Sequence, residues 1–198
     1  MNNKAATKPS DEALMEGMAR GDIKDLELLY KRYRTAVLHF ISAVLVGVSP
    51  ADAEDVSQDV FLTLFKTASR YKERGTLRGW LFGIAVKKTR AAQRKQWRRL
   101  KLLKEKVPEL AHLRRSTDTN PERTMLDREQ ISSLMGGITP RHREVLMMRM
   151  GEGLNGEEIA LALGISRNSV FVRLHRAQQA LAKAIENSGE DLDSRSTQ

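Results

Sequence analysis

Residues 156–182 read GEEIALALGISRNSVFVRLHRAQQALA, and this stretch predicts two helices joined by a tight turn. Ile159 and Leu163 recur at the spacing of one helix face. Gly164 follows where the backbone must adopt a left-handed conformation, and Ser166 is a preferred cap for the next helix. This is the layout of a helix-turn-helix.

The second of these helices has an apolar face and a polar face. Val170, Leu174 and Ala177 form the inner stripe, so the opposite face points away from the core. Its side chains can hydrogen-bond base edges, touch a thymine methyl group or reach phosphate. We expect contacts with duplex DNA from Arg167, Asn168, Phe171, Val172, Arg173, His175, Arg176 and Gln179. The alternative interpretation is a helical hairpin with a solvated polar face.

The positive charge of the chain is local. The 198 residues carry a net charge of +9 at pH 7. Residues 70–115 hold 16 basic and 3 acidic side chains, a net charge of +13, so the rest of the chain is slightly acidic. A localised basic segment is attracted to a phosphate backbone or to an anionic lipid surface.

Several classes of function are disfavoured by composition. With no cysteine, the chain cannot form disulfides, use a thiol nucleophile or bind metal through thiolates. The four histidines are scattered and have no partners at metal-ligand spacing. We therefore expect no catalytic site, metal or cofactor, and no enzymatic activity. The N-terminus lacks the apolar core of a signal peptide and no segment is apolar enough to span a membrane, which predicts a cytoplasmic protein without membrane contact of its own.

The apolar residues recur in helical periods along most of the chain, and no stretch alternates as a strand would. We predict a helix from Asp22 that ends at Gly47 and Ser49-Pro50. A second helix, around Val56 and Val60, carries an acidic outer face. A polar loop, YKERGTLRG, then precedes a third and strongly basic helix beginning at Trp80.

These patterns predict an all-α fold of two small helical domains joined by a flexible linker. We expect an N-terminal tail and start of the first helix at 1–20, a first domain at 21–100, a linker at 101–120, a helix-turn-helix domain at 121–186 and a disordered tail at 187–198. Met147, Met148 and Met150 are expected to pack in the core of the second domain.

Three motifs occur in order along the chain: ADAEDVSQDVFLTLF, RGTLRGWLFGIAVKKTR and TPRHREVLMMRMGEGLNGEEIALALGISRNSVFVRLHRAQQAL. Together they resemble the two domains of an extracytoplasmic-function (ECF) sigma factor of bacterial RNA polymerase, of the sigma-70 family, over about three quarters of the chain. The resemblance implies that the first domain binds the polymerase core and melts the −10 promoter element, and that the second domain reads the −35 element. It also implies an inhibitory anti-sigma partner.

The resemblance assigns the acidic helix to the basic clamp of the polymerase core. An acidic face is repelled by DNA, which agrees with a protein partner; a solvated helix face is the alternative. The residues expected to bind polymerase are Asp52, Glu54, Asp55, Gln58, Asp59 and Phe61.

The resemblance implies that the loop and the basic helix form the region that captures the melted −10 strand in sigma factors of this family. The residues expected to bind it are Tyr71, Arg74, Arg78, Trp80, Lys87, Lys88, Arg90 and Arg94. The sequence departs from the family in this helix, because Gly83 replaces a common arginine and Val86-Lys87 replaces a common Arg-Asn pair. In the recognition helix, Phe171-Val172 replaces a common Lys-Ser pair, so the −35 sequence cannot be transferred from relatives.

A self-sufficient helix-turn-helix regulator is the alternative function. Such a protein would bind duplex DNA alone, whereas a sigma factor would need polymerase to hold its two domains apart. For a sigma factor, we expect the free protein either to sample many interdomain arrangements or to be held compact by an inhibitor.

Overall fold

The computed structural model describes residues 9–71, 76–106 and 135–195, and all regular structure within these ranges is helical. The predicted all-α fold is therefore confirmed. In the same ranges, no helix combines the length and the apolar character that a membrane crossing requires.

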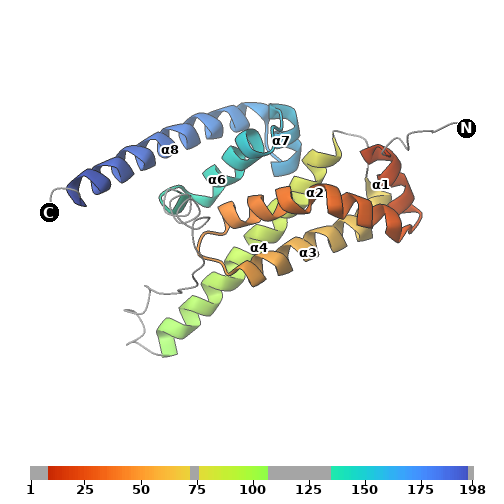
Figure 1. Ribbon diagram of the computed structural model, residues 1–198, viewed down its shortest axis with the longest axis horizontal. Coiled ribbons are helices and arrows are strands. Elements are labelled where there is room, and N and C mark those ends of the chain that lie inside the picture. Colours follow the sequence, from red (N-terminus) through yellow and green to blue (C-terminus); the bar gives the residue numbers. More distant parts are fainter. Residues whose placement is uncertain (1–8, 72–75, 107–134, 196–198) are drawn as a thin grey trace, which may run out of the picture.

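The first domain is built from four α-helices (Figure 1). They are α1 (Asp11–Ala19), α2 (Ile23–Val44), α3 (Pro50–Thr67) and α4 (Leu77–Lys106), with a 3-10 turn, η1 (Ala68–Arg70), after α3. Helices α2, α3 and α4 pack on one another around a core in which the rings of Phe40 and Phe82 meet edge to face at 5.3 Å. Ser49 caps α3, and Pro50 occupies its first turn.

Helix α1 replaces most of the predicted N-terminal tail. Its Leu14, Met15 and Met18 are buried against the rest of the domain, and Ser10 caps its first turn. Asp11 accepts hydrogen bonds from Arg32 and Tyr33 of α2. Burial and this hydrogen bond raise the pKa of the Tyr33 hydroxyl. Residues 11–19 are thus part of the first domain.

Helix α4 is longer than predicted at both ends. It begins at Leu77 because the Thr76 hydroxyl accepts a hydrogen bond from the Gly79 amide at 3.2 Å and so caps the first turn. It continues to Lys106, so the first six residues of the predicted linker are helical. The reason is the absence of glycine and proline between Gly83 and Pro108 in a segment rich in good helix formers. The rest of the predicted linker lies outside the described residues.

The second domain contains α6 (Pro140–Leu146), a π-helical turn, η3 (Met147–Gly151), α7 (Gly156–Leu163) and α8 (Arg167–Arg195). Asn155 and Glu158 form a reciprocal capping box at the start of α7. Met148 is fully buried, but Met150 is 66% exposed, so the prediction that all three methionines pack in the core was wrong for Met150. The π turn places Met150 on the outer side.

The prediction of a disordered tail at 187–198 was wrong for most of its residues. Helix α8 continues to Arg195, so residues 187–195 are helical and only 196–198 lie outside the description. Once a helix is started, each further residue adds one hydrogen bond at low entropic cost, and no proline interrupts this segment.

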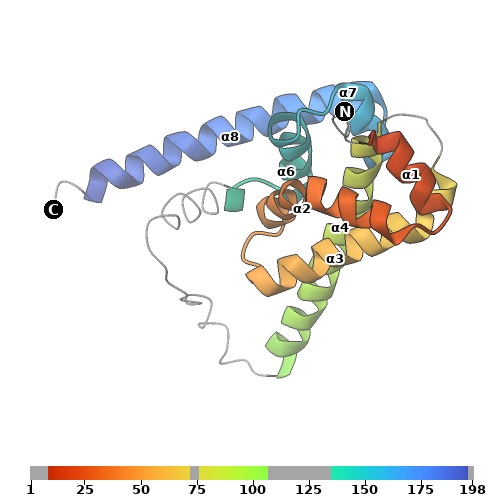
Figure 2. The same cartoon turned by 45° about the vertical axis from the view of Figure 1, so that its right-hand side comes forward.

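The two domains pack against each other in what we call the closed arrangement. Helix α7 lies on the first half of α4, while α6 and η3 contact α2 (Figures 1 and 2). The buried apolar residues of the two domains form one continuous cluster. The long helix α8 runs along the far side of the second domain, away from α3 (Figure 2).

Candidate nucleic-acid interface

The helix-turn-helix of α7 and α8 has the geometry that its sequence predicts. Gly164 has a φ of 65°, and the Ser166 hydroxyl accepts a hydrogen bond from the Ser169 amide at 3.1 Å. Val170 and Ala177 are buried on the inner side of α8. The turn therefore fixes which face of α8 is free.

The outer face of α8 carries most of the residues expected to read DNA. Exposed side chains on it are those of Arg167, Asn168, Phe171, Val172, His175, Arg176 and Gln179. Arg173 is half-buried and lines a groove toward α4, and Arg167 is paired with Glu157 of α7 at 3.0 Å. Phe171 is 71% exposed on this face.

The acidic face of α3 divides into free and occupied carboxylates. Asp52 and Asp55 are exposed, as is the amide of Gln58, and Asp52 accepts a hydrogen bond from the hydroxyl of Ser49 at 2.7 Å. Glu54 is paired with Arg34 of α2, and Asp59 accepts a hydrogen bond from Lys88 of α4 at 2.9 Å. Of the acids predicted to bind polymerase, Asp55 has the simplest surroundings, since it makes no side-chain bond to any other residue that the structure describes.

The prediction that Phe61 binds polymerase was wrong, because its side chain is buried. Its side chain is 3% exposed and its ring meets that of Tyr30 edge to face at 4.9 Å inside the first domain. The residue lies on the inner side of α3, together with Val60 and Leu64, so it supports the helix from within and cannot serve as an exposed anchor for a partner.

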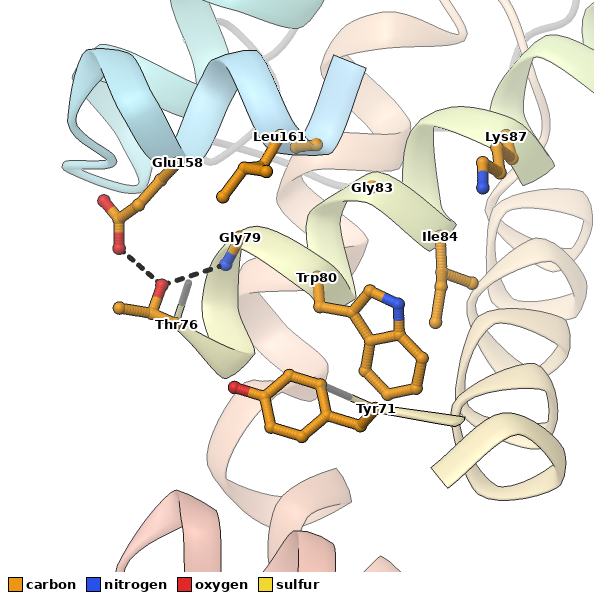
Figure 3. Close-up of a pocket in the computed structure, with 10 residues that line it drawn as sticks. Tyr71, Thr76, Gly79, Trp80, Gly83, Ile84, Lys87, Glu158 and Leu161 are labelled. Carbon is orange, nitrogen blue, oxygen red and sulfur yellow. Dashed lines mark hydrogen bonds between the residues drawn. The ribbon is translucent and has the colours of Figure 1, made fainter. Parts of the chain in front are cut away.

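The aromatic residues expected to meet the melted strand lie together. The rings of Tyr71 and Trp80 are 5.0 Å apart, and both line a cavity of about 180 Å³ between α4 and α7 (Figure 3). Lys87 lines the same cavity from two turns beyond Trp80 on α4, and Glu158 and Leu161 close it from the second domain. Arg74, which was predicted to join them, lies outside the described residues.

Two of the predicted arginines are bound to the second domain instead of being free. Arg90 makes a two-pronged ion pair with Glu144 of α6, with nitrogen-to-oxygen distances of 2.8 and 2.7 Å. This partner raises the pKa of Arg90. Arg78 donates to the backbone oxygen of Glu152 and lies 3.3 Å from its carboxylate. Lys87 and Arg94 remain exposed.

The acidic partners of these arginines were missed by the sequence analysis. Glu144 and Glu152 are buried, at 1% and 7% exposure, and Glu158 accepts a hydrogen bond from Thr76 in the loop before α4. Buried glutamates are rare unless they are paired, but a sequence does not show which distant arginine will supply the pair. No group of three potential metal ligands occurs among the residues described.

Two family models match this chain. Residues 29–99 match the family Sigma-70 region 2, and residues 128–181 match the family Sigma-70, region 4. The ECF RNA polymerase sigma factor SigD of Mycobacterium tuberculosis is 31% identical over 186 residues, which cover 91% of this chain and 85% of the relative. The chain belongs to the ECF sigma factors.

Further relatives agree with this assignment. RNA polymerase sigma factor NccH of Alcaligenes xylosoxydans xylosoxydans is 30% identical over 92% of this chain and 98% of its own length. The solved structure of CnrH in complex with the cytosolic domain of CnrY shares the fold, with a TM-score of 0.68, 23% identity and coverage of 90% and 99% of the two chains. The sigma factor RpoE from Bartonella quintana, solved with the anti-sigma factor NepR, has a TM-score of 0.67 at 20% identity, over 82% of this chain and 98% of its own. The protein is a promoter-directing RNA polymerase sigma factor.

Proposed function

We propose that this sigma factor binds the polymerase core through the exposed acidic part of α3. The observation that carries the proposal is the separation of charges: exposed carboxylates gather on α3, and the long run of basic residues from Lys87 to Arg99 lies on α4. Phosphate repels an acidic surface, so Asp52, Asp55 and Gln58 suit a basic protein partner. Glu54 and Asp59 contribute after exchanging their present partners, Arg34 and Lys88.

The start of α4 would then capture the melted −10 strand. Tyr71 and Trp80 offer ring faces on which an unpaired base can stack, and Lys87, Arg90 and Arg94 follow along the same helix to hold phosphates. Lys88 supports the same stretch once it is released from Asp59.

The exposed face of α8 would read the −35 element in the major groove. Asn168, His175 and Gln179 have side chains that can discriminate base edges, and Val172 can touch a thymine methyl group. The protein acts in this scheme by binding alone, without catalysis and without a cofactor.

We also expect an anti-sigma partner. CnrH was solved with the cytosolic domain of CnrY, and the sigma factor from Bartonella quintana was solved with the anti-sigma factor NepR. No residue of this chain identifies the partner.

The test of polymerase binding is a charge reversal with a matched control. Asp55→Lys should weaken binding to immobilised core polymerase by at least about tenfold, because it places a positive charge against a basic surface. Glu186→Lys, at another exposed acid, on α8, is the control and should bind as the unchanged protein does. Equal affinity of both variants for polymerase would refute the role of α3.

A further inference from the structure

A groove between the two domains gathers arginine side chains from three helices. Its volume is about 730 Å³, within the range of about 300–1,000 Å³ that is usual for small-molecule sites. The arginines that line it are Arg90 and Arg94 of α4, Arg141 of α6 and Arg173 of α8. The groove is therefore large enough for a ligand of nucleotide size, and both domains contribute to its walls.

The positive charge of this groove is only partly balanced. Among the described residues that line it, Glu144 is the single acid, and both its oxygens accept from Arg90, at 2.8 and 2.7 Å. Glu144 is 1% exposed, so it has no further oxygen to offer. Arg94, Arg141 and Arg173 form no side-chain bond with any residue in the described part of the chain. Three positive charges remain in the groove.

These three charges suit a ligand with several negative charges. Like charges repel, so three unbalanced guanidinium groups along one groove destabilise the packing of their helices unless an anion lies between them. Guanidinium groups bind phosphate oxygens through paired hydrogen bonds. Arg94 and Arg141 are exposed and Arg173 is half-buried, so a ligand can reach all three. A chain of phosphates matches three arginines on three helices better than a single phosphate does.

An aromatic ring extends the groove along α4. Trp97 lines it and is 71% exposed. It follows Arg90 by seven residues and Arg94 by three, which places these side chains on one face of the helix. An exposed ring beside phosphate-binding arginines can stack on a nucleobase. Leu163 and Ile165 add apolar surface from the second domain. The groove thus combines the groups that recognise the two ends of a nucleotide.

We propose that this groove is a binding site for a nucleoside polyphosphate. Its phosphates lie between Arg94, Arg141 and Arg173, and its base stacks on Trp97. Arg94 and Arg173 are also assigned to DNA, so a bound nucleotide excludes DNA from these two side chains; this consequence alone rests on the proposed function. DNA binding by the free protein then responds to the nucleotide concentration.

The test of the phosphate site is calorimetric titration of the full chain with ATP, in a buffer without divalent cations. Arg141→Gln is the informative variant, because Arg141 is exposed and has no assigned role toward DNA or polymerase. It should weaken ATP binding by at least about tenfold, since it removes a charge-assisted hydrogen bond. Arg99→Gln removes the same charge from an exposed position of α4 outside the groove and should bind ATP as the unchanged protein does.

The test of the base site compares ATP with inorganic tripolyphosphate. The unchanged protein should bind ATP at least about fivefold more tightly, because only ATP gains a stacking contact. Trp97→Ala should remove this preference and leave the affinity for tripolyphosphate unchanged. Trp97 is largely exposed, so its replacement does not disturb the core, and circular dichroism verifies that the helices are kept.

The proposal is overturned if the unchanged protein does not bind ATP, or if Arg141→Gln and Arg99→Gln bind it equally, because ATP would then follow the general positive charge of α4. Equal affinity for ATP and tripolyphosphate would overturn the assignment of a nucleoside to Trp97. These titrations use the free protein, so failure of the proposed polymerase contact is recorded separately, by the Asp55→Lys experiment.

Discussion

At the scale of the residue, promoter choice should depend on a few side chains of α8. Asn168 and His175 are exposed on the outer face of this helix, two turns apart. Replacing both by alanine should change which −35 sequences are used, since one good base contact is worth about 1–3 kcal/mol of discrimination. The measurement is selection of −35 sequences from a randomised promoter library transcribed by the holoenzyme. Lys183→Ala, further along the same helix, is the control. If the double variant selects the same −35 sequence as the unchanged protein, other residues recognise the −35 element.

Individual residues also show what the sequence could and could not predict. The outward face of α8 was predictable, because helical periodicity fixes which side chains oppose Val170 and Ala177. Phe61 was assigned to the wrong side of α3. A resemblance transfers a position in a motif, whereas burial depends on the neighbouring helix, here on Tyr30. The pairing of Arg90 with Glu144 joins residues 54 positions apart, and no local pattern signals it.

At the scale of the element, the turn between α7 and α8 depends on Gly164. Its φ of 65° disfavours any residue with a Cβ. Gly164→Ala should destabilise the second domain by about 1–2 kcal/mol, which lowers its melting temperature by roughly 4–16 °C. Thermal unfolding followed by circular dichroism measures the change. Gly136→Ala is the control, because its backbone is not left-handed and its Cβ would meet open space. Equal melting of the two variants would mean that this turn adapts without strain.

Element boundaries were predictable where a specific capping residue marks them. Ser49-Pro50 and Asn155-Gly156 start helices where turn chemistry places them. The ends of α4 and α8 were not predictable, because a surface helix that meets no proline continues until another force stops it. Helix α1 was expected only as a tail and the start of the first helix, although Ser10 followed by Asp11 and Glu12 is the start signal of a separate helix.

At the scale of the whole molecule, two domains that pack against each other in the closed arrangement must separate to bridge a promoter. Two elements about two turns of DNA apart lie on the order of 70 Å from each other. Residues 107–134 connect the described parts of the two domains, and 28 residues can reach at most about 90–100 Å when fully extended. The chain is long enough for this span, but an extended segment is entropically costly, so we infer that polymerase supplies the surface that holds it.

The central claim is that this protein reads promoters only as part of the polymerase. The most direct measurement is fluorescence anisotropy of a promoter duplex, selected with the holoenzyme, against a scrambled duplex of the same length, with and without core polymerase. We predict that the protein alone binds both duplexes weakly and within about threefold of each other, and that core polymerase raises the preference for the promoter to about a thousandfold or more. Tight binding of the promoter by the protein alone, with the scrambled duplex rejected, would contradict the account and identify a self-sufficient helix-turn-helix regulator.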